Sequence, residues 1–562
     1  MQKKSNLLSL LAISIIFSAC NLNDNSKINY SNEYSNNISN ENNTSKTTKP
    51  YVASYKGLQF YYDDMPTSNY TLEQLSDSDF NALPFKKRLI VANNLLNSLF
   101  FGYKYKDLID KINSGNFIST IKNNLSKNRI KRDELEDFIS NSENFNQYTN
   151  KAWARPQVVK ILTRFYAMNK LDRYYFENYI AYILTQTIMF SPAYELRTSH
   201  TPDISRVYNR IINMLDINSG MSYITYVHMM SQDNWRRFRS PEDNGREMLE
   251  IFTLDTNDSH VPLAAKALKN WRLNSDSDTL EVGLNKNTTP IELFDTIIYN
   301  GEDFYRELVK SKKFKYGVTK RLVDFYFPNK SNLAKNKIIK DILKSNPNKW
   351  QDIIKQILFS KEYLLHNNRA LSAEESFFSF TKKLDFKVRK DAFAYFKNKL
   401  NEMHQAPMRY KLGRLHRVPL DSLSFATYNK FLREYIFLNY AYSNIDDKNS
   451  WKYDGWSEDF ISTKNFKIYE NNPKMSLKSF INYIFNSTIS RDISSDEFEL
   501  FKEHMMETKD DVEVLRDEFN IIKNSSNADS DRLKRRRNVA RVVMDYISRL
   551  EETYTQKGLN NE

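Results

Sequence analysis

Glycine is scarce in this chain, and this scarcity restricts what the chain can fold into. Only 11 of the 562 residues are glycine and 14 are proline. β-Rich folds need glycine at turns with positive φ, and nucleotide-binding loops need it where the backbone approaches a phosphate. Both features must be rare here, so the composition favours an all-α fold.

Apolar residues recur at i, i+3 and i+4 spacing, which is typical of helices with one buried face. The most apolar internal run, 179–190, is too short to span a bilayer, so we expect a buried helix there. The chain is also longer than one ordinary core requires, which predicts two or three subdomains of packed αα-hairpins with little or no β-sheet. The helical spacing holds in the stretches 94–102, 158–165, 174–190, 204–215 and 339–343.

The first twenty residues have the pattern of an export signal. Lys3 and Lys4 precede an apolar run at 7–17, and Ser18-Ala19-Cys20 follows it. The run is too short for a membrane span, and a cysteine after small residues resembles a bacterial lipobox. Cys20 would then be acylated and become the mature N-terminus. The alternative is an ordinary signal peptide with an incidental cysteine.

Residues 21–50 are rich in Asn, Ser and Thr and lack apolar periodicity, which predicts a disordered tether. Thirty such residues have a root-mean-square reach of roughly 30 Å. With a lipid anchor at Cys20, the folded body would stand off a bacterial membrane, the outer membrane in preference to the inner, on its periplasmic or surface face. The predicted segments are a signal peptide at 1–19, a tether at 20–50, and helical regions at 51–150, 151–385 (the central core) and 386–562.

The charge balance is basic. The formal net charge is +13, and +11 once Lys3 and Lys4 are removed with the signal. Such a surplus favours anionic partners such as lipid head groups, acidic glycans or an acidic protein. Nucleic acid is not expected, because an exported chain rarely meets it. The alternative is codon bias in an AT-rich genome, which would also raise Asn, Ile, Tyr and Phe.

One helix start is clearly marked. Ser240 is a suitable N-cap, Pro241 stands where no N–H is needed, and acidic residues follow in the first turn. A helix should run through 245–254, and a second helix should begin near Pro262. Together they predict an αα-hairpin in which small residues allow close packing. The second helix would carry Ala264, Ala265, Ala267, Leu268 and Trp271.

These segments resemble the bacterial domain-of-unknown-function family numbered 1800. Its signature runs roughly N-Y-A-R-E-L-M-E-L-H-T-L-G and is followed by A-R-x-L-T-G-W, and the matching pieces fall in family order from about residue 90 to 440. Members often occur beside a secreted family that resembles sulfatases, which implies a protein partner in the envelope. The resemblance otherwise implies an exported helical protein without an established activity. The motif residues that match are Asp233, Asn234, Arg246, Glu247, Glu250, Thr253, Trp271 and Arg321.

The chain departs from the signature at several polar positions. Asp243 replaces the family's Asn, Asn244 its Tyr, Phe252 its His and Asp255 its Gly. A polar site formed by those residues would therefore be altered or lost in this chain.

Three carboxylates could still perform hydrolysis. Glu247 and Glu250 stand three residues apart, with Cβ atoms ~5–6 Å apart, and Asp233 could lie near. Retaining glycosidases set two carboxyl groups roughly 5–5.5 Å apart across a cleft. The structural interpretation is that Glu250 pairs with Arg246. We then expect both side chains to be partly buried and to hold the hairpin to the segment containing Asp233 and Asn234.

No cofactor or metal site is predicted. The histidines show neither HxxxH nor HxH spacing, and the GxSxG, GxxxxGK[ST] and GxGxxG patterns are absent. Cys20 is the single cysteine, and acylation would consume it. The seven histidines are His200, His228, His260, His366, His404, His416 and His504.

The sequence thus leads to a lipid-anchored envelope protein of unknown activity. The leading hypothesis is a non-enzymatic binding or scaffold protein for an envelope partner protein or an acidic polymer. The alternative is an envelope hydrolase that acts on a glycan or on a sulfated or esterified polymer through Asp233, Glu247 and Glu250.

Overall fold

The structure is a computed structural model, and all its described residues except Tyr51 belong to one compact unit, Val52–Glu562. Cys20, the expected tether at 21–50 and half of 158–165 lie outside the described residues. The structure describes residues 51–55, 58–62, 70–127, 161–162, 164–165, 168, 170–189, 204–274, 280–282, 289–384, 396, 399–400, 402–403, 405, 425–430, 432, 477–506 and 542–559.

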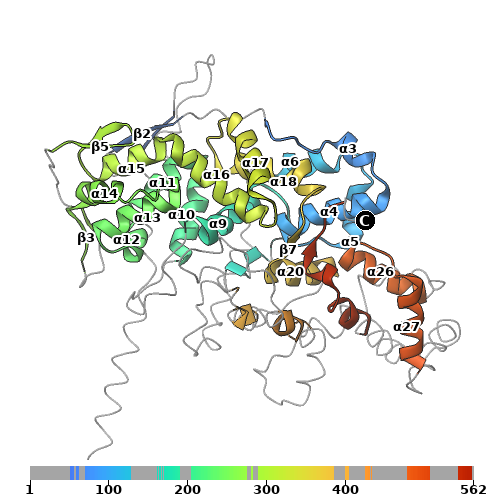
Figure 1. The fold of residues 1–562 in the computed structure, drawn as a ribbon. Helices are drawn as coiled ribbons and strands as arrows, with labels where there is room; N and C mark the ends of the chain where they lie inside the picture. The colour runs from blue at the N-terminus through green and yellow to red at the C-terminus, as the bar shows by residue number, and fades with distance from the viewer. Residues whose placement is uncertain are drawn as a thin grey trace, which may run out of the picture. The chain divides into compact units, whose positions relative to one another are not determined.

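The predicted all-α fold is confirmed (Figure 1). Helices make up most of the described chain, and its sheets are two-stranded ladders in the orders β1-β2, β3-β4, β5-β6 and β7-β8. The first elements are β1 (Tyr51–Tyr55), β2 (Leu58–Tyr62), α3 (Asp77–Asn81), α4 (Phe85–Phe100), α5 (Tyr105–Ile112) and α6 (Phe117–Asn124). Next come α9 (Arg173–Thr187), α10 (Ile204–Asp216), α11 (Met221–Met229), α12 (Gln232–Arg237), α13 (Pro241–Thr253), α14 (His260–Leu268), β3 (Trp271–Leu273), β4 (Leu280–Val282), β5 (Ile291–Leu293) and β6 (Thr296–Ile298).

The remaining elements include β7, α20, α26, η2 and β8, which lie at or beside the cavity described below. Most of them follow one another closely in sequence, whereas the last four come from the C-terminal end of the chain. They are α15 (Gly301–Lys310), α16 (Lys312–Tyr326), α17 (Asn332–Lys344), α18 (Trp350–Leu358), α19 (Lys361–Leu364), β7 (Arg369–Ala370), α20 (Ala373–Lys383), α26 (Leu477–Ile489), α27 (Ser495–Met506), the 3₁₀ turn η2 (Glu551–Thr553) and β8 (Thr555–Gln556).

Nine of the described helices begin with a side-chain cap. In each case the capping oxygen accepts a backbone N–H of the first turn, which satisfies a donor that the helix itself leaves unpaired. Complete capping boxes form at Ser76 with Asp79 and at Ser372 with Glu375. The capping residues are Ser76, Asp172, Ser231, Ser240, Asn300, Ser311, Ser331, Ser360 and Ser372.

Two helix ends show how the chain manages with so little glycine. The C-cap residues are Phe101 after α4 and Leu254 after α13. Both adopt the left-handed conformation, with φ of 52° and 57°. Glycine usually occupies such a position, because other L-residues pay roughly 1–2 kcal/mol there. At α4 burial offsets this cost, since the Phe101 ring packs edge-on against Phe165, Tyr182 and Phe378.

α9 lies in the core, as the apolar run at 179–190 predicts. All its residues after Arg173 are buried, polar ones included. The hydroxyls of Tyr179 and Tyr326 lie 2.9 Å apart, which joins α9 to α16 inside the core. No helix in the described part of the chain has the length and apolarity needed to cross a membrane.

The predicted αα-hairpin is present as α13 and α14, which pack closely. A Cβ placed on Gly245 would lie 2.8 Å from the Cβ of Ala264, so these small residues set the spacing. One detail of the prediction is wrong. α14 ends at Leu268, and Trp271 begins strand β3, paired with Val282.

α16 packs against α13 even more tightly. A Cβ on Gly317 would lie 2.4 Å from the carbonyl oxygen of Phe252 and 3.0 Å from the Cα of Thr253. Both contacts are with backbone atoms, which cannot rotate away. The close contact between α16 and the C-terminal end of α13 therefore requires a residue without a side chain at position 317.

Gly317→Ala should destabilise the fold by about 1–3 kcal/mol, because the added methyl forces the two helices apart. Tyr316→Ala is the matched control on the same helix, since Tyr316 is exposed and its truncation should stay within about 0.5 kcal/mol of wild type. Urea unfolding of both variants measures the difference. Equal unfolding curves for the two variants would refute the close packing of α16 on α13.

Candidate functional site

The family-motif residues form helix-packing contacts around α12, α13 and α16. Asp233 is buried and forms ion pairs with Arg210 and, at 3.9 Å, with Arg236. Asn234 is also buried, and its amide donates to the carbonyl oxygen of Met229 at 3.1 Å. These two residues therefore hold α12 to its neighbours from inside the protein.

The expected Arg246–Glu250 pair does not form. Arg246 instead contacts Glu242, four residues earlier, at 3.2 Å, and both side chains are about half exposed or more. Salt bridges with this exposure contribute little to stability. The sequence cannot distinguish the partner four residues before an arginine from the partner four residues after it. The prediction that Arg246 and Glu250 hold the hairpin to Asp233 and Asn234 is wrong.

Arg321 is the side chain that anchors this hairpin, and it anchors it to α16. Its guanidinium donates to the backbone carbonyl oxygens of Glu250 at 2.7 Å and of Ile251 at 2.5 Å. The last carbonyls of a helix lack partners within the helix, so a cation is favourable there. Thr253 is buried and donates to the carbonyl oxygen of Leu249 at 2.6 Å. The motif thus fixes the C-terminal end of α13 to α16.

Trp271 belongs to a buried aromatic group at the other end of the hairpin. It stacks on Trp235, with ring centroids 5.7 Å apart, and meets Tyr305 edge-on at 5.5 Å. The Tyr305 hydroxyl accepts from the Trp235 indole N–H at 3.1 Å and donates to Asn244 at 2.7 Å. Asn244, one of the departures from the family signature, is therefore used structurally here.

The three carboxylates considered for hydrolysis do not share a cleft. Glu247 and Glu250 are half-buried on α13, whereas Asp233 is buried against arginine. None of the three lines either of the two cavities described in this structure. Within the described residues, no cluster of His, Cys, Asp and Glu side chains has the geometry to hold a metal ion.

The larger cavity, of about 240 Å³, lies elsewhere and has mixed walls, to which Ile90, Leu371, Phe380, Ile489 and Leu559 contribute apolar side chains. Its walls come from α4, α20, the end of α26 and the C-terminal segment after η2. At about 30 Å³ per water molecule it has room for about eight waters, comparable to one sugar ring. The polar and charged side chains on its walls are Asn93, Asn94, Asn97, Ser376, Ser379, Lys383, Thr488, Ser490, Arg491, Glu552, Thr553, Thr555 and Lys557.

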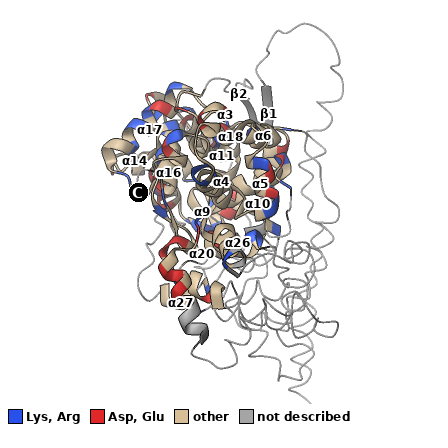
Figure 2. Cartoon of the chain, turned by 90° about the vertical axis from the view of Figure 1, so that its right-hand side faces the viewer, with Lys and Arg blue, Asp and Glu red and all other residues tan. Residues whose placement is uncertain are grey.

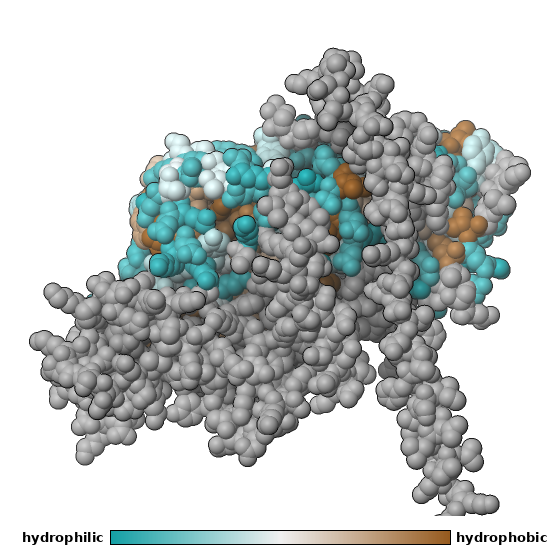
Figure 3. Space-filling view, turned by 180° about the vertical axis from the view of Figure 1, so that it is seen from behind, coloured by the Kyte–Doolittle hydropathy of each residue, from teal (hydrophilic) through white to brown (hydrophobic). Residues whose placement is uncertain are grey.

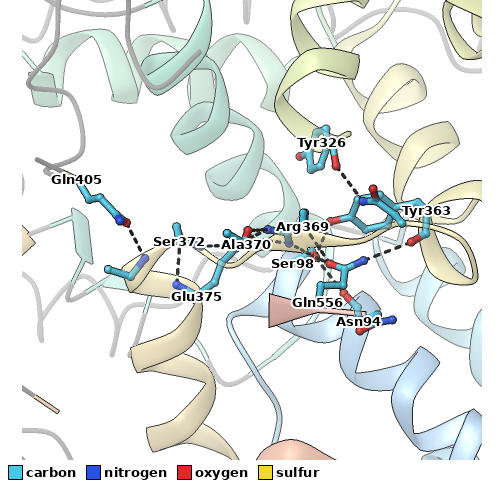
Figure 4. Close-up of polar contacts among 12 residues, drawn as sticks. Asn94, Ser98, Tyr326, Tyr363, Arg369, Ala370, Ser372, Glu375, Gln405 and Gln556 are labelled. Carbon is cyan, nitrogen blue, oxygen red and sulfur yellow. Dashed lines mark hydrogen bonds and ion pairs between the residues drawn. The ribbon is translucent and has the colours of Figure 1, made fainter. Parts of the chain in front are cut away.

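A buried ion pair beside the cavity positions its walls (Figure 4). The Arg369 guanidinium is fully buried and contacts both carboxylate oxygens of Glu375, at 2.8 and 3.0 Å. It also donates to Ser98 at 2.7 Å, to Tyr363 at 3.2 Å and to the side-chain oxygen of Gln556 at 3.0 Å. Burial alone lowers the pKa of Arg369, but the facing Glu375 raises it, and the net shift is upward.

The Arg369 network joins segments that are distant in sequence. Arg369 lies on β7, Glu375 on α20, Ser98 on α4 and Gln556 on β8. β7 and β8 pair antiparallel, with Arg369 opposite Gln556. All four elements adjoin the cavity, so the network sets where its walls stand.

Lys383 is the charged group on the cavity wall that is most deeply buried. Only 5 % of the residue is exposed, and its ammonium donates to the carbonyl oxygen of Thr488 at 2.9 Å. No carboxylate among the described residues forms an ion pair with it. Burial lowers the pKa of Lys383 to about 7. The group is therefore close to half charged at neutral pH.

Amide and hydroxyl groups surround this lysine. The Asn93 amide nitrogen donates to Ser490 at 2.5 Å, whereas its buried oxygen has no hydrogen-bond partner among the described residues. Ser379 donates to the side-chain oxygen of Asn97 at 2.9 Å, which leaves the Asn97 amide nitrogen as a donor. The Asn93 oxygen is closed off from solvent, so it is an unsatisfied acceptor inside the wall, whereas Asn97 and Ser379 supply polar groups to the cavity.

Sequence reasoning missed this cavity. Lys383 and the carbonyl of Thr488 are 105 residues apart, and Arg369 and Ser98 are 271 residues apart. The one local signal is the Ser372–Glu375 capping box, in which Glu375 also faces Arg369. No protein family, curated protein or solved structure matches the chain in our comparisons. The likeness to family 1800 therefore stays a prediction.

Glu375→Gln should destabilise the protein by roughly 3–5 kcal/mol, because it leaves the Arg369 charge buried without its counter-ion. Glu242→Gln, which removes the acid of the exposed pair with Arg246, should leave the urea unfolding curve close to that of wild type. If both variants unfold at the same urea concentration, the Arg369 network does not carry the role given to it here.

Proposed function

We propose that this protein is a lipid-anchored binding protein of the bacterial cell envelope and that its folded body holds an acidic envelope polymer. The observation that carries the proposal is the cavity with Lys383 on its wall, because a buried cation without a carboxylate partner favours an anionic ligand. The anchor at Cys20 and the tether at 21–50 supply the location.

The charge distribution supports an anionic partner. Three exposed lysines follow one face of α17, at positions 337, 340 and 344, and Figure 2 shows basic residues on this helix. The acidic side chains are concentrated elsewhere, notably on α27 (Figure 2). On the face drawn in Figure 3 the described surface is mostly hydrophilic, with small separate apolar areas, as expected for contact with a hydrated polymer.

Binding is a better explanation than hydrolysis for this geometry. Asp233 is held by arginines, and Glu247 and Glu250 are neighbours on one helix surface, so the three do not flank a substrate. The resemblance to family 1800 adds one further proposed partner, a secreted sulfatase-like protein of the envelope. Nucleic acid is not part of the proposal.

Cys20→Ser should abolish metabolic labelling with a fatty acid and move the protein from the membrane fraction to the soluble fraction. Labelling and fractionation of cells that express each form measure this change. The matched control is Ser18→Ala, which keeps a small residue ahead of the cysteine and should behave like wild type. Unchanged labelling of Cys20→Ser would contradict the anchor.

Full-length protein in detergent should retain an acidic polysaccharide, polygalacturonate, and release no new reducing ends from it. Retention on immobilised polymer and a reducing-end assay distinguish the two functions. Turnover without retention would overturn the binding proposal in favour of the hydrolase.

A further inference from the structure

We infer that the cavity beside Arg369 is the binding site for one sugar-acid unit, with Lys383 contacting the carboxylate and Asn97 and Ser379 contacting the hydroxyls. This inference rests on the proposed function and names the ligand class of the same site. The ligand is identified by its chemistry, a carboxylate on a ring of hydroxyls.

The charged part of the site follows from the surroundings of Lys383. Its ammonium uses one donor on the carbonyl oxygen of Thr488 and keeps two donors. Thr488 lies at the C-terminal end of α26, where exposed carbonyls favour a cation. The carbonyl supplies only a partial negative charge, so a carboxylate would complete the pairing of this buried ammonium.

The hydroxyl-binding part follows from Asn97 and Ser379. Ser379 donates its hydrogen to Asn97 and keeps its oxygen as an acceptor, while the Asn97 nitrogen remains a donor, so together they complement a hydroxyl group, which can do both. Asn97 lies on α4 and Ser379 on α20, and both line the cavity. The cavity of about 240 Å³ limits the ligand to about one ring.

The other ionisable groups of the cavity are already engaged. Arg491 contacts both oxygens of Glu497, at 2.7 and 2.8 Å, and Glu552 at 3.2 Å. Lys557 contacts Glu551 at 3.6 Å. On the cavity walls, Lys383 is thus the cation that remains for a ligand carboxylate.

The test uses full-length protein in detergent and three probes, galacturonate, galactose and inorganic phosphate. Galacturonate and galactose differ only in the carboxylate, so calorimetry should detect the acid and at least about tenfold weaker binding of the neutral sugar. Phosphate should also bind at least about tenfold more weakly than galacturonate, because it lacks a ring of hydroxyls. If galactose binds as tightly as galacturonate, Lys383 does not recognise the carboxylate. If phosphate binds as tightly as galacturonate, the site recognises an anion and not a sugar acid.

Lys383→Met keeps the shape of the side chain and removes its charge, and it should weaken galacturonate binding at least about tenfold. Lys382→Met is the matched control. Its ammonium lies over the Phe100 ring at 4.1 Å and donates to the Phe100 carbonyl, away from the cavity, so this variant should bind as wild type does.

If Lys383→Met does not fold, the pH dependence of galacturonate affinity in the wild-type protein tests the role of Lys383 independently. Because the pKa of Lys383 lies at about 7, galacturonate affinity should fall at least about tenfold between pH 6 and pH 8.5, as the ammonium loses its proton. Burial also lowers the pKa of the neighbouring Lys382 to about 7, so the same pH series on Lys382→Met is the control and should keep the wild-type dependence. An affinity that does not change with pH would overturn the inference.

The outcomes separate this inference from the proposed function. If Lys383→Met retains both polygalacturonate and galacturonate as wild type does, the acidic polymer binds elsewhere and only the cavity assignment fails. If the wild-type protein binds neither, the acidic-polymer function fails as well.

Discussion

The contact between Arg369 and Glu375 is the interaction on which the rest of this account depends. It is a two-point ion pair inside the protein, completed by Ser98, Tyr363 and Gln556. A buried charge is tolerated only when its hydrogen bonds are satisfied, and the guanidinium meets that condition here. The pair holds a short C-terminal strand against two helices from earlier in the chain, and the cavity lies beside these elements.

Lys383 lies on α20, the helix that carries Glu375, and unlike Arg369 it is a buried cation without a carboxylate partner among the described residues. Arg369 is fully paired, whereas Lys383 has a single carbonyl partner and a pKa lowered to about 7 by burial. Burial lowers the pKa of Lys382 to about 7 as well, but Lys382 lies away from the cavity, so it is the position of Lys383 on a cavity wall that connects this lysine with ligand binding. The structure thus separates a cation that maintains the fold from one that serves the site.

The sequence predicted what is local and missed what is not. The Ser240 cap, the hairpin of α13 and α14 and the buried α9 follow from spacing and capping chemistry, which act within a few residues. The Arg246 pairing failed because the i−4 and i+4 neighbours of a helical residue are equally close. The Arg369 network and the Lys383 cavity join segments 105 to 271 residues apart, and no local pattern encodes such contacts.

The most direct test of the central claim is the number of protons taken up when galacturonate binds. Calorimetry at pH 8 in buffers of different ionisation enthalpy measures this number for the full-length protein. The account predicts uptake approaching one proton, because Lys383 is mostly neutral before binding and becomes charged beside the carboxylate. Binding without proton uptake would show that another group holds the carboxylate and would contradict the account.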